Sequence, residues 1–253
     1  MIQNWQFNQA HGLICFISDL HLFSDRCCVQ EHTDVIRRSI ERSDLCIWGG
    51  DLFDFRWSRL GCEERSVSEA IAWLDRWTQQ FPQKQFLYLD GNHDAHLPFR
   101  LDLKTWSQGV STFDCGYDSV RIGDTVFTHG DVIEGRGSLQ AFRDYRASWE
   151  NKPVASRFAS RAYDVAIAVR AHQVAALTAH RKRSTCLRLL RWLHRQDSES
   201  VTGVRRFVFG HTHRRLLGYE VGGVRFYNGG AAIRHVPFSP ILIDYQEAID
   251  ELR

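Results

Sequence analysis

The sequence of 253 residues lacks any long hydrophobic run. No segment approaches the roughly 18 to 20 apolar residues of a membrane-spanning helix, and residues 1–11 do not combine a basic start with an apolar stretch. We therefore expect neither a cleaved export signal nor an integral membrane protein. Hydrophobic residues make up 43% of the chain and charged residues 25%, which is ordinary for a single globular domain spanning residues 1–253.

The seven cysteines include no CxxC pair, and their number is odd. Three of them, Cys15, Cys46 and Cys115, lie in or beside apolar, strand-like segments. This pattern is typical of a reduced setting and does not indicate a disulfide framework. We therefore expect a cytoplasmic protein.

Short apolar runs alternate with helix-like segments through most of the chain. Runs at 13–17, 45–48, 86–89 and 207–209 predict strands buried on both faces of a sheet, and 30–42 and 67–80 predict helices between them. Segments 119–127, 215–220, 224–227 and 241–245 add two hairpins and a last strand, and so predict a second, mixed or antiparallel sheet. The expected fold class is α/β, with two sheets packed face to face and helices outside.

Five polar clusters follow apolar runs, at 19–21, 50–54, 91–94, 128–131 and 210–213. They are expected along one rim of the sheets, where open α/β sheets bind ligands. Asp19 and His21 are two residues apart in what reads as an extended segment, so both could reach one ion, which His213 could complete. Asp51 is the candidate for a carboxylate that bridges two ions. The second ion would take a neutral oxygen and two imidazoles, from Asn92, His129 and His211. Oxygen and nitrogen donors favour Mn²⁺, Fe²⁺ or Zn²⁺.

Two divalent ions about 3.5 to 4 Å apart activate water and clamp a phosphoryl oxygen, so the clusters predict hydrolysis of a P–O bond. His93 is not needed as a ligand and is the candidate general acid, with Asp94 expected to orient its ring. Asp54 and Asp131 are expected behind the ligands, holding them or a turn in place. A single Asp-x-His or His-x-His is more often turn chemistry, so the prediction depends on all five clusters together.

The interval between His129 and His211, 82 residues, is about twice the others, and residues of about 138–197 are expected to form a helical insertion that caps the core, with a helix at 157–177. Residues 131–196 carry 13 Lys plus Arg against 5 Asp plus Glu, a balance of +8. Guanidinium groups bind phosphate, which predicts a substrate-binding role for arginines early in this segment: Arg136, Arg143, Arg146, Arg157 and Arg161. The basic run 181–183 with the leucines after it could rest on an anionic membrane or pack on the core.

The five clusters, in this order, resemble the calcineurin-like metallophosphoesterase signature from Asp19 to His213. The resemblance implies a four-layer α/β/β/α sandwich with a helical cap insertion, a dinuclear centre with Mn²⁺ as the expected metal and Fe²⁺ or Zn²⁺ as alternatives, and the ligand roles given above. No nucleic-acid partner is expected.

Within that superfamily the chain is most similar to UDP-2,3-diacylglucosamine hydrolases. The likeness lies in the segments 17–22 and 50–54, the insertion after His129-Gly130-Asp131, and the stretch 140–143. It implies cleavage of the pyrophosphate of a lipid-linked nucleotide in lipid A synthesis, releasing UMP and 2,3-diacylglucosamine 1-phosphate, with peripheral contact with the inner membrane.

One position departs from that family, which typically has Arg where this chain has His93. His93 is the form of the wider superfamily and keeps a second enzyme class open, a phosphatase or phosphodiesterase acting on a soluble nucleotide or phosphoprotein. A non-catalytic metal-binding scaffold is a third interpretation. It is disfavoured because such a scaffold would be expected to have lost a ligand or His93, and none is missing.

Overall fold

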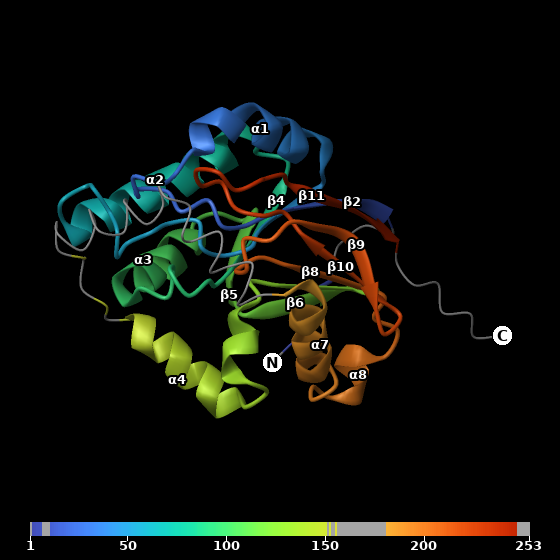
Figure 1. Ribbon diagram of the computed structural model, residues 1–253. Coiled ribbons are helices and arrows are strands. Elements are labelled where there is room, and N and C mark those ends of the chain that lie inside the picture. Colours follow the sequence, from blue (N-terminus) through green and yellow to red (C-terminus); the bar gives the residue numbers. More distant parts are fainter. Residues whose placement is uncertain (1, 7–10, 151, 153–154, 156–180, 247–253) are drawn as a thin grey trace.

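Two β-sheets lie face to face, with helices on the outer face of each (Figure 1). The computed structural model describes residues 2–6, 11–150, 152, 155 and 181–246. This arrangement is the α/β/β/α sandwich that the sequence predicts.

The first sheet has the strand order β11-β2-β3-β4-β5. Its strands are β2 (His11–Ile17), β3 (Leu45–Trp48), β4 (Gln85–Leu89), β5 (Phe113–Tyr117) and β11 (Ile241–Gln246). Strands β2 to β5 are parallel, and β11 pairs antiparallel with β2. The sequence associates this last strand with the second sheet. It joins the first instead, where Ile241, Ile243 and Tyr245 are buried between the sheets.

The second sheet has the order β1-β6-β7-β8-β10-β9 and is mixed, as expected. Its strands are β1 (Gln3–Asn4), β6 (Ser119–Ile122), β7 (Thr125–Thr128), β8 (Arg206–Phe209), β9 (Leu216–Val221) and β10 (Val224–Asn228). Both predicted hairpins form, as the antiparallel pairs β6–β7 and β9–β10. Strands β7, β8 and β10 run parallel to one another.

Helices cover both outer faces. Those described are η1 (Val29–His32), α1 (Thr33–Arg42), α2 (Glu63–Gln80), α3 (Leu97–Ser107), η2 (Asp131–Gly135), α4 (Leu139–Glu150), α7 (Lys182–Leu193) and α8 (Ser198–Val201). Side chains of α1, α2 and α3 pack on the first sheet, and those of α7 pack on the second. Helix α3 is not apparent from the sequence pattern, because it has a proline in its first turn and buries only Phe99 and Leu103.

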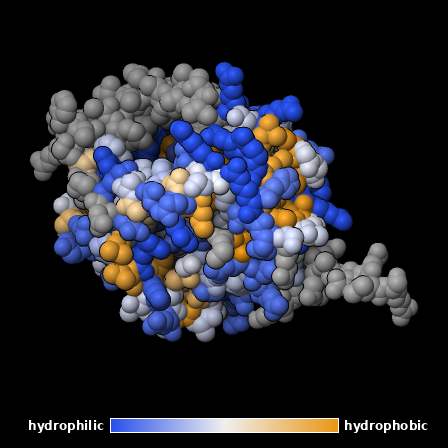
Figure 2. Space-filling view, turned by 90° about the horizontal axis from the view of Figure 1, so that it is seen from below, coloured by the Kyte–Doolittle hydropathy of each residue, from blue (hydrophilic) through white to orange (hydrophobic). Residues whose placement is uncertain are grey.

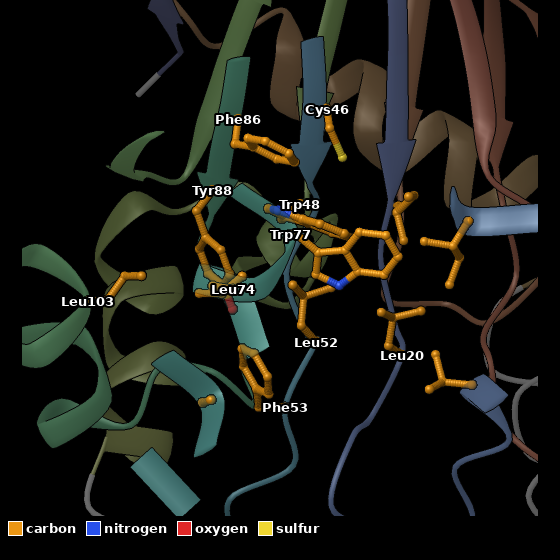
Figure 3. Packing of buried hydrophobic residues seen from close by; sticks show 14 of the residues in the cluster. Leu20, Cys46, Trp48, Leu52, Phe53, Leu74, Trp77, Phe86, Tyr88 and Leu103 are labelled. Atoms are coloured by element: carbon orange, nitrogen blue, oxygen red, sulfur yellow. The ribbon is translucent and has the colours of Figure 1, made fainter. Parts of the chain in front are cut away.

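Alternation along each strand sends side chains into two different cores. Cys46 and Trp48 of β3 point toward the helices, where Trp48 packs with Trp77 and Phe86 (Figure 3). Leu45 and Ile47, the alternate residues, lie between the two sheets. The continuous apolar runs in the sequence are therefore strands buried on both faces.

Helix α7 forms the fourth layer. Its residues Leu189, Leu190 and Leu193 are buried against the second sheet together with Phe207 and Phe226. Of the leucines that follow the basic run, these three pack on the core, whereas Leu187 is exposed. The expected helix at 157–177 lies outside the described residues.

The ends of β2, β3, β4, β7 and β8 place the five polar clusters at one rim. Three apolar side chains within the clusters, Leu20, Leu52 and Phe53, are fully buried in the core between the first sheet and its helices (Figure 3). They anchor the loops that carry the polar residues and so limit the positions those residues can take. Among the described helices, none combines the length and the hydropathy that a membrane-spanning helix requires.

Candidate metal centre

The loops after β2 and β3 run side by side and are joined by backbone hydrogen bonds. The Asp19 amide donates to the Gly50 carbonyl at 3.0 Å, and the His21 amide donates to the Asp51 carbonyl at 3.1 Å. The sequence predicts an extended segment around Asp19, and this is wrong. Asp19 and His21 both have a left-handed backbone, with φ of 56° and 49°. Pairing with the neighbouring loop sets this conformation.

Left-handed backbone recurs through the predicted ligands. Asp51, His211 and His213 have φ of 53°, 63° and 52°, so five of the seven expected ligands lie in this region. Each such non-glycine residue costs roughly 1–3 kcal/mol, and this kind of strain clusters at functional sites. The strained backbone and the metal-type side chains therefore coincide.

Glycines allow the loops to approach closely. A Cβ at Gly91 would overlap the backbone nitrogen and Oδ1 of Asp51, and a Cβ at Gly210 would overlap Asp19 and Ser18. Any larger residue at either position would push a predicted ligand out of place. The glycine before Asn92 and the glycine before His211 are thus part of the site.

Asp19, His21 and His213 form the first cluster, in which one potential ligand atom of each lies within 4.8 Å of the others. His21 Nε2 and His213 Nε2 are 3.0 Å apart, and His213 Nε2 is 3.4 Å from Asp19 Oδ1. This is the set that the sequence assigns to the first ion. Burial and the nearby charge of Arg26 lower the pKa of His21 to about 3, which keeps its imidazole in the neutral form that binds metals.

Asp51, His129 and His211 form the second cluster, also with ligand atoms within 4.8 Å. His129 Nε2 lies 3.3 Å from Asp51 Oδ2, and His211 Nδ1 lies 3.0 Å from the Asn92 side-chain oxygen. The structure therefore brings all seven predicted ligands together in two adjoining groups. A backbone carbonyl, that of Gly49, lies 2.9 Å from His129 Nδ1 and fixes the ring orientation.

The side chains present fit divalent metal ions. His129 Nε2 is buried and makes no hydrogen bond among the described residues. Burial acts to lower the pKa of His129, but the Asp51 and Asp19 carboxylates outweigh it and raise the pKa to about 10, so the ring faces concentrated negative charge. The closely spaced imidazole nitrogens of His21 and His213 are expected where two lone pairs converge on one cation. The clusters contain no thiolate, consistent with Mn²⁺, Fe²⁺ or Zn²⁺.

Asp54 lies behind the first cluster and contacts three side chains. Its Oδ2 accepts a hydrogen bond from Arg26 Nη2 at 2.6 Å and lies 3.6 Å from His21 Nδ1, while its Oδ1 is 3.0 Å from His93 Nδ1. His21, Asp54 and His93 also satisfy the spacing of a metal group. The Arg26 guanidinium already neutralises this carboxylate, so the contacts favour an orienting role for Asp54.

The expected pairing of Asp94 with His93 is wrong. Asp94 accepts hydrogen bonds from the backbone amides of Leu52 and Phe53 at 3.1 and 3.0 Å. The His93 amide donates to Asp51 Oδ1 at 2.8 Å, so the chain turns there and the two neighbouring side chains diverge. Asp94 holds the loop that carries Asp51, and Asp54 orients His93.

His93 lies at the open side of the clusters, with its side chain 14% exposed. Burial acts to lower its pKa, but the Asp54 and Asp51 carboxylates outweigh burial and raise it. Trp149, near the end of α4, packs against the ring with centroids 4.6 Å apart. The start of the insertion therefore reaches the site, and His93 has the position and partner of a proton donor.

The predicted phosphate-binding arginines do not act as one group. The prediction that Arg146 binds the substrate is corrected by its contacts. Arg146 is buried, forms an ion pair with Asp131, and donates from Nη2 to the Asp90 carbonyl at 2.6 Å. These partners use its guanidinium to tie α4 to the core. Arg136 and Arg143 are exposed, Arg136 in a cleft beside α7. Arg157 and Arg161 lie outside the described residues.

Two residues at the site have no signal in the sequence. Arg26, in the loop after β2, contacts Asp54 and lies 3.1 Å from His21 Nδ1. Glu134, in η2, places Oε1 3.3 Å from His211 Nε2. Neither belongs to a recognisable polar cluster, and the Arg26–Asp54 and Glu134–His211 contacts join residues 28 and 77 positions apart.

The comparison with protein families identifies a match that covers most of the chain. The family described as calcineurin-like phosphoesterase matches residues 12–215, which contain every predicted metal ligand. No curated protein matches the chain.

Proposed function

The chain belongs to the calcineurin-like phosphoesterase family and is a metal-dependent phosphoester hydrolase, and we propose that it cleaves the pyrophosphate of UDP-2,3-diacylglucosamine. The reaction would use two divalent ions, for which Mn²⁺ is the first candidate. The observation that carries the two-ion part is the convergence of seven donors into two adjoining groups, with Asp51 in the second group and its backbone carbonyl hydrogen-bonded to His21 of the first. A single ion would leave one of these groups unused.

Two divalent ions supply Lewis-acid activation of water and neutralise charge on the phosphoryl group. Asp19, His21 and His213 would hold one ion, and Asn92, His129 and His211 the other, with Asp51 shared. The protein groups then provide orientation. Asp54 and the Gly49 carbonyl fix the rings of His93 and His129, which keeps the correct ring nitrogen facing the site.

His93 would give its proton to the leaving oxygen. Its ring is held by Asp54 through Nδ1, which leaves Nε2 for the substrate. A positioned acid contributes about 10²–10⁴-fold to such a reaction. Trp149 covers one side of the ring and limits the access of water to it.

The substrate assignment is supported by the insertion and by sequence resemblance. Helix α4 comes after η2, which follows the His129 cluster, and brings Trp149 and Tyr145 toward the site, which offers apolar surface beside the metal-binding residues. A diacylated sugar needs such surface for its chains. A lipid substrate would also bring the protein into peripheral contact with the inner membrane.

One observation favours a second candidate, a phosphodiesterase or phosphatase acting on a soluble nucleotide or phosphoprotein. His93 stands where the diacylglucosamine hydrolases typically have Arg, and it is integrated here with Asp54 and Arg26. A site organised around a histidine acid suits leaving groups that need a proton.

The test compares UMP release from UDP-2,3-diacylglucosamine and from the same sugar nucleotide without its acyl chains, and adds a panel of soluble nucleotides, phosphopeptides and an aryl phosphodiester. We expect kcat/KM for the acylated sugar nucleotide to exceed that for the deacylated compound by orders of magnitude, because only the former contacts the insertion. Equal values would contradict the lipid substrate, and a preference for a soluble phosphoester would support the second candidate.

A further inference from the structure

A basic cleft lies between η2 and α7, apart from the metal-binding clusters. It has a volume of about 260 Å³, and four arginines line it, Arg136, Arg188, Arg191 and Arg195, over apolar side chains of Val132 and Ile133. The face that carries α4, α7 and α8 shows a strongly hydrophilic band (Figure 2). The catalytic role described above uses none of the three arginines from the α7 segment.

The spacing along α7 explains how three guanidinium groups gather. Arg188, Arg191 and Arg195 are three and four residues apart, which places them on one side of the helix and its end. The opposite side is fixed by Leu189 and Leu193, both buried on the second sheet. The helix therefore presents these arginines from a rigid support, and their positions do not depend on a mobile loop.

Backbone conformation at the end of η2 forms the other wall. Arg136 and Gly137 both have a left-handed backbone, with φ of 48° and 89°. A Cβ at Gly137 would overlap the Arg195 guanidinium, so this group lies directly against the glycine. Arg195 Nη1 also donates to the Arg136 carbonyl at 3.5 Å. The turn and the guanidinium thus fit each other.

The charge of the cleft calls for an anion. Its lining has four cationic side chains and no carboxylate among the described residues. Like charges placed together raise the free energy of the folded state, and a bound anion relieves that repulsion. The volume lies below the roughly 300–1,000 Å³ of pockets for drug-sized ligands, and guanidinium groups hold phosphate through paired hydrogen bonds.

We propose that this cleft binds a phosphate group, either of free phosphate or of a lipid headgroup, at a site separate from the metal centre. The two sites are neighbours. Glu134, in the same turn as Val132 and Ile133, contacts His211 of the second metal cluster.

The experiment measures inorganic phosphate binding to the full-length protein by calorimetry at low salt, and co-sedimentation with phosphatidylcholine vesicles with and without phosphatidic acid. Arg191→Ala and Arg195→Ala are each expected to weaken binding at least roughly tenfold, the effect of losing one charge-assisted hydrogen bond. Arg195→Lys should restore part of the affinity. The exposed Arg76→Ala on α2, at the other side of the molecule, should leave it unchanged.

Asp51→Ala separates the cleft from the metal centre, because it removes the central carboxylate of the latter. Phosphate binding that persists in Asp51→Ala and falls in the arginine variants supports the cleft. Loss of all binding in Asp51→Ala, or unchanged affinity in both arginine variants with both probes, overturns it. Arginine-dependent binding in the calorimetric arm alone identifies free phosphate, and binding in the vesicle arm alone identifies a lipid headgroup.

Discussion

His93 Nδ1 lies 3.0 Å from Asp54 Oδ1, and the same carboxylate binds Arg26 and lies near His21. One buried acid therefore connects the candidate proton donor with a metal ligand. Asp94, the next residue in the sequence after His93, has a different task, because it accepts two backbone hydrogen bonds from the loop after β3.

This arrangement predicts distinct effects for the residues around His93. His93→Ala should lower kcat for an aryl phosphodiester by about 10²–10⁴-fold with unchanged metal content, since the residue acts as an acid and is not a ligand. Asp54→Asn should also lower kcat, through loss of ring orientation. Steady-state kinetics and elemental analysis of the same preparations check both.

Asp94→Asn is the matched control, since it changes the carboxylate that is next to His93 in the sequence but does not contact its ring. We expect it to lower the free energy of unfolding, because one of the two loop amides then faces an NH2 group in place of a carboxylate oxygen. The kcat of the folded enzyme should fall less than in Asp54→Asn. A larger loss of kcat in Asp94→Asn, with fold and metals intact, would restore Asp94 as the partner of His93.

Glu134 is predicted to position His211. Its carboxylate lies at Nε2 while Nδ1 faces Asn92, so it can fix the ring that serves the second cluster. Glu134→Gln should weaken the binding of one of two metal ions by about 10- to 100-fold, as measured by titration with a chelator. Glu150→Gln on α4, which weakens the ion pair with Arg100, should leave metal affinity unchanged. Equal affinities in both variants would exclude the positioning role.

Arg146 is predicted to stabilise the fold. Breaking a buried ion pair by removing one partner costs about 3–5 kcal/mol, so Arg146→Met should lower the free energy of unfolding by that order in urea titrations. Arg143→Ala, an exposed position on the same helix, should change it by less than about 0.5 kcal/mol. If Arg146→Met instead raised KM with unchanged stability, Arg146 would be a substrate-binding residue.

The strands and the metal-type residues could be predicted from the sequence because both depend on local pattern. Continuous apolar runs such as Leu45–Trp48 identify strands buried on both faces, and parallel strands bring residues at their ends to one rim. Asp51 and His129 are recognisable for this reason although 78 residues separate them.

The contacts that sequence analysis missed depend on the direction of the chain in turns and on long-range packing. Whether His93 meets Asp54 or Asp94 is decided by a turn that the Asp51 carboxylate fixes through the His93 amide. The partners of Arg146 and the sheet joined by β11 are set by elements far apart in the chain. Residue type alone could not distinguish a buried structural arginine from one that binds phosphate.

The central claim is that two divalent ions share Asp51. The most direct measurement is a crystal structure of the metal-loaded protein with anomalous scattering, combined with elemental analysis of wild type and Asp51→Ala. We predict two ions about 3.5 to 4 Å apart on either side of Asp51 in the wild type, and loss of metal from Asp51→Ala. A single ion held by Asp19, His21 and His213, with the same occupancy in Asp51→Ala, would contradict the account.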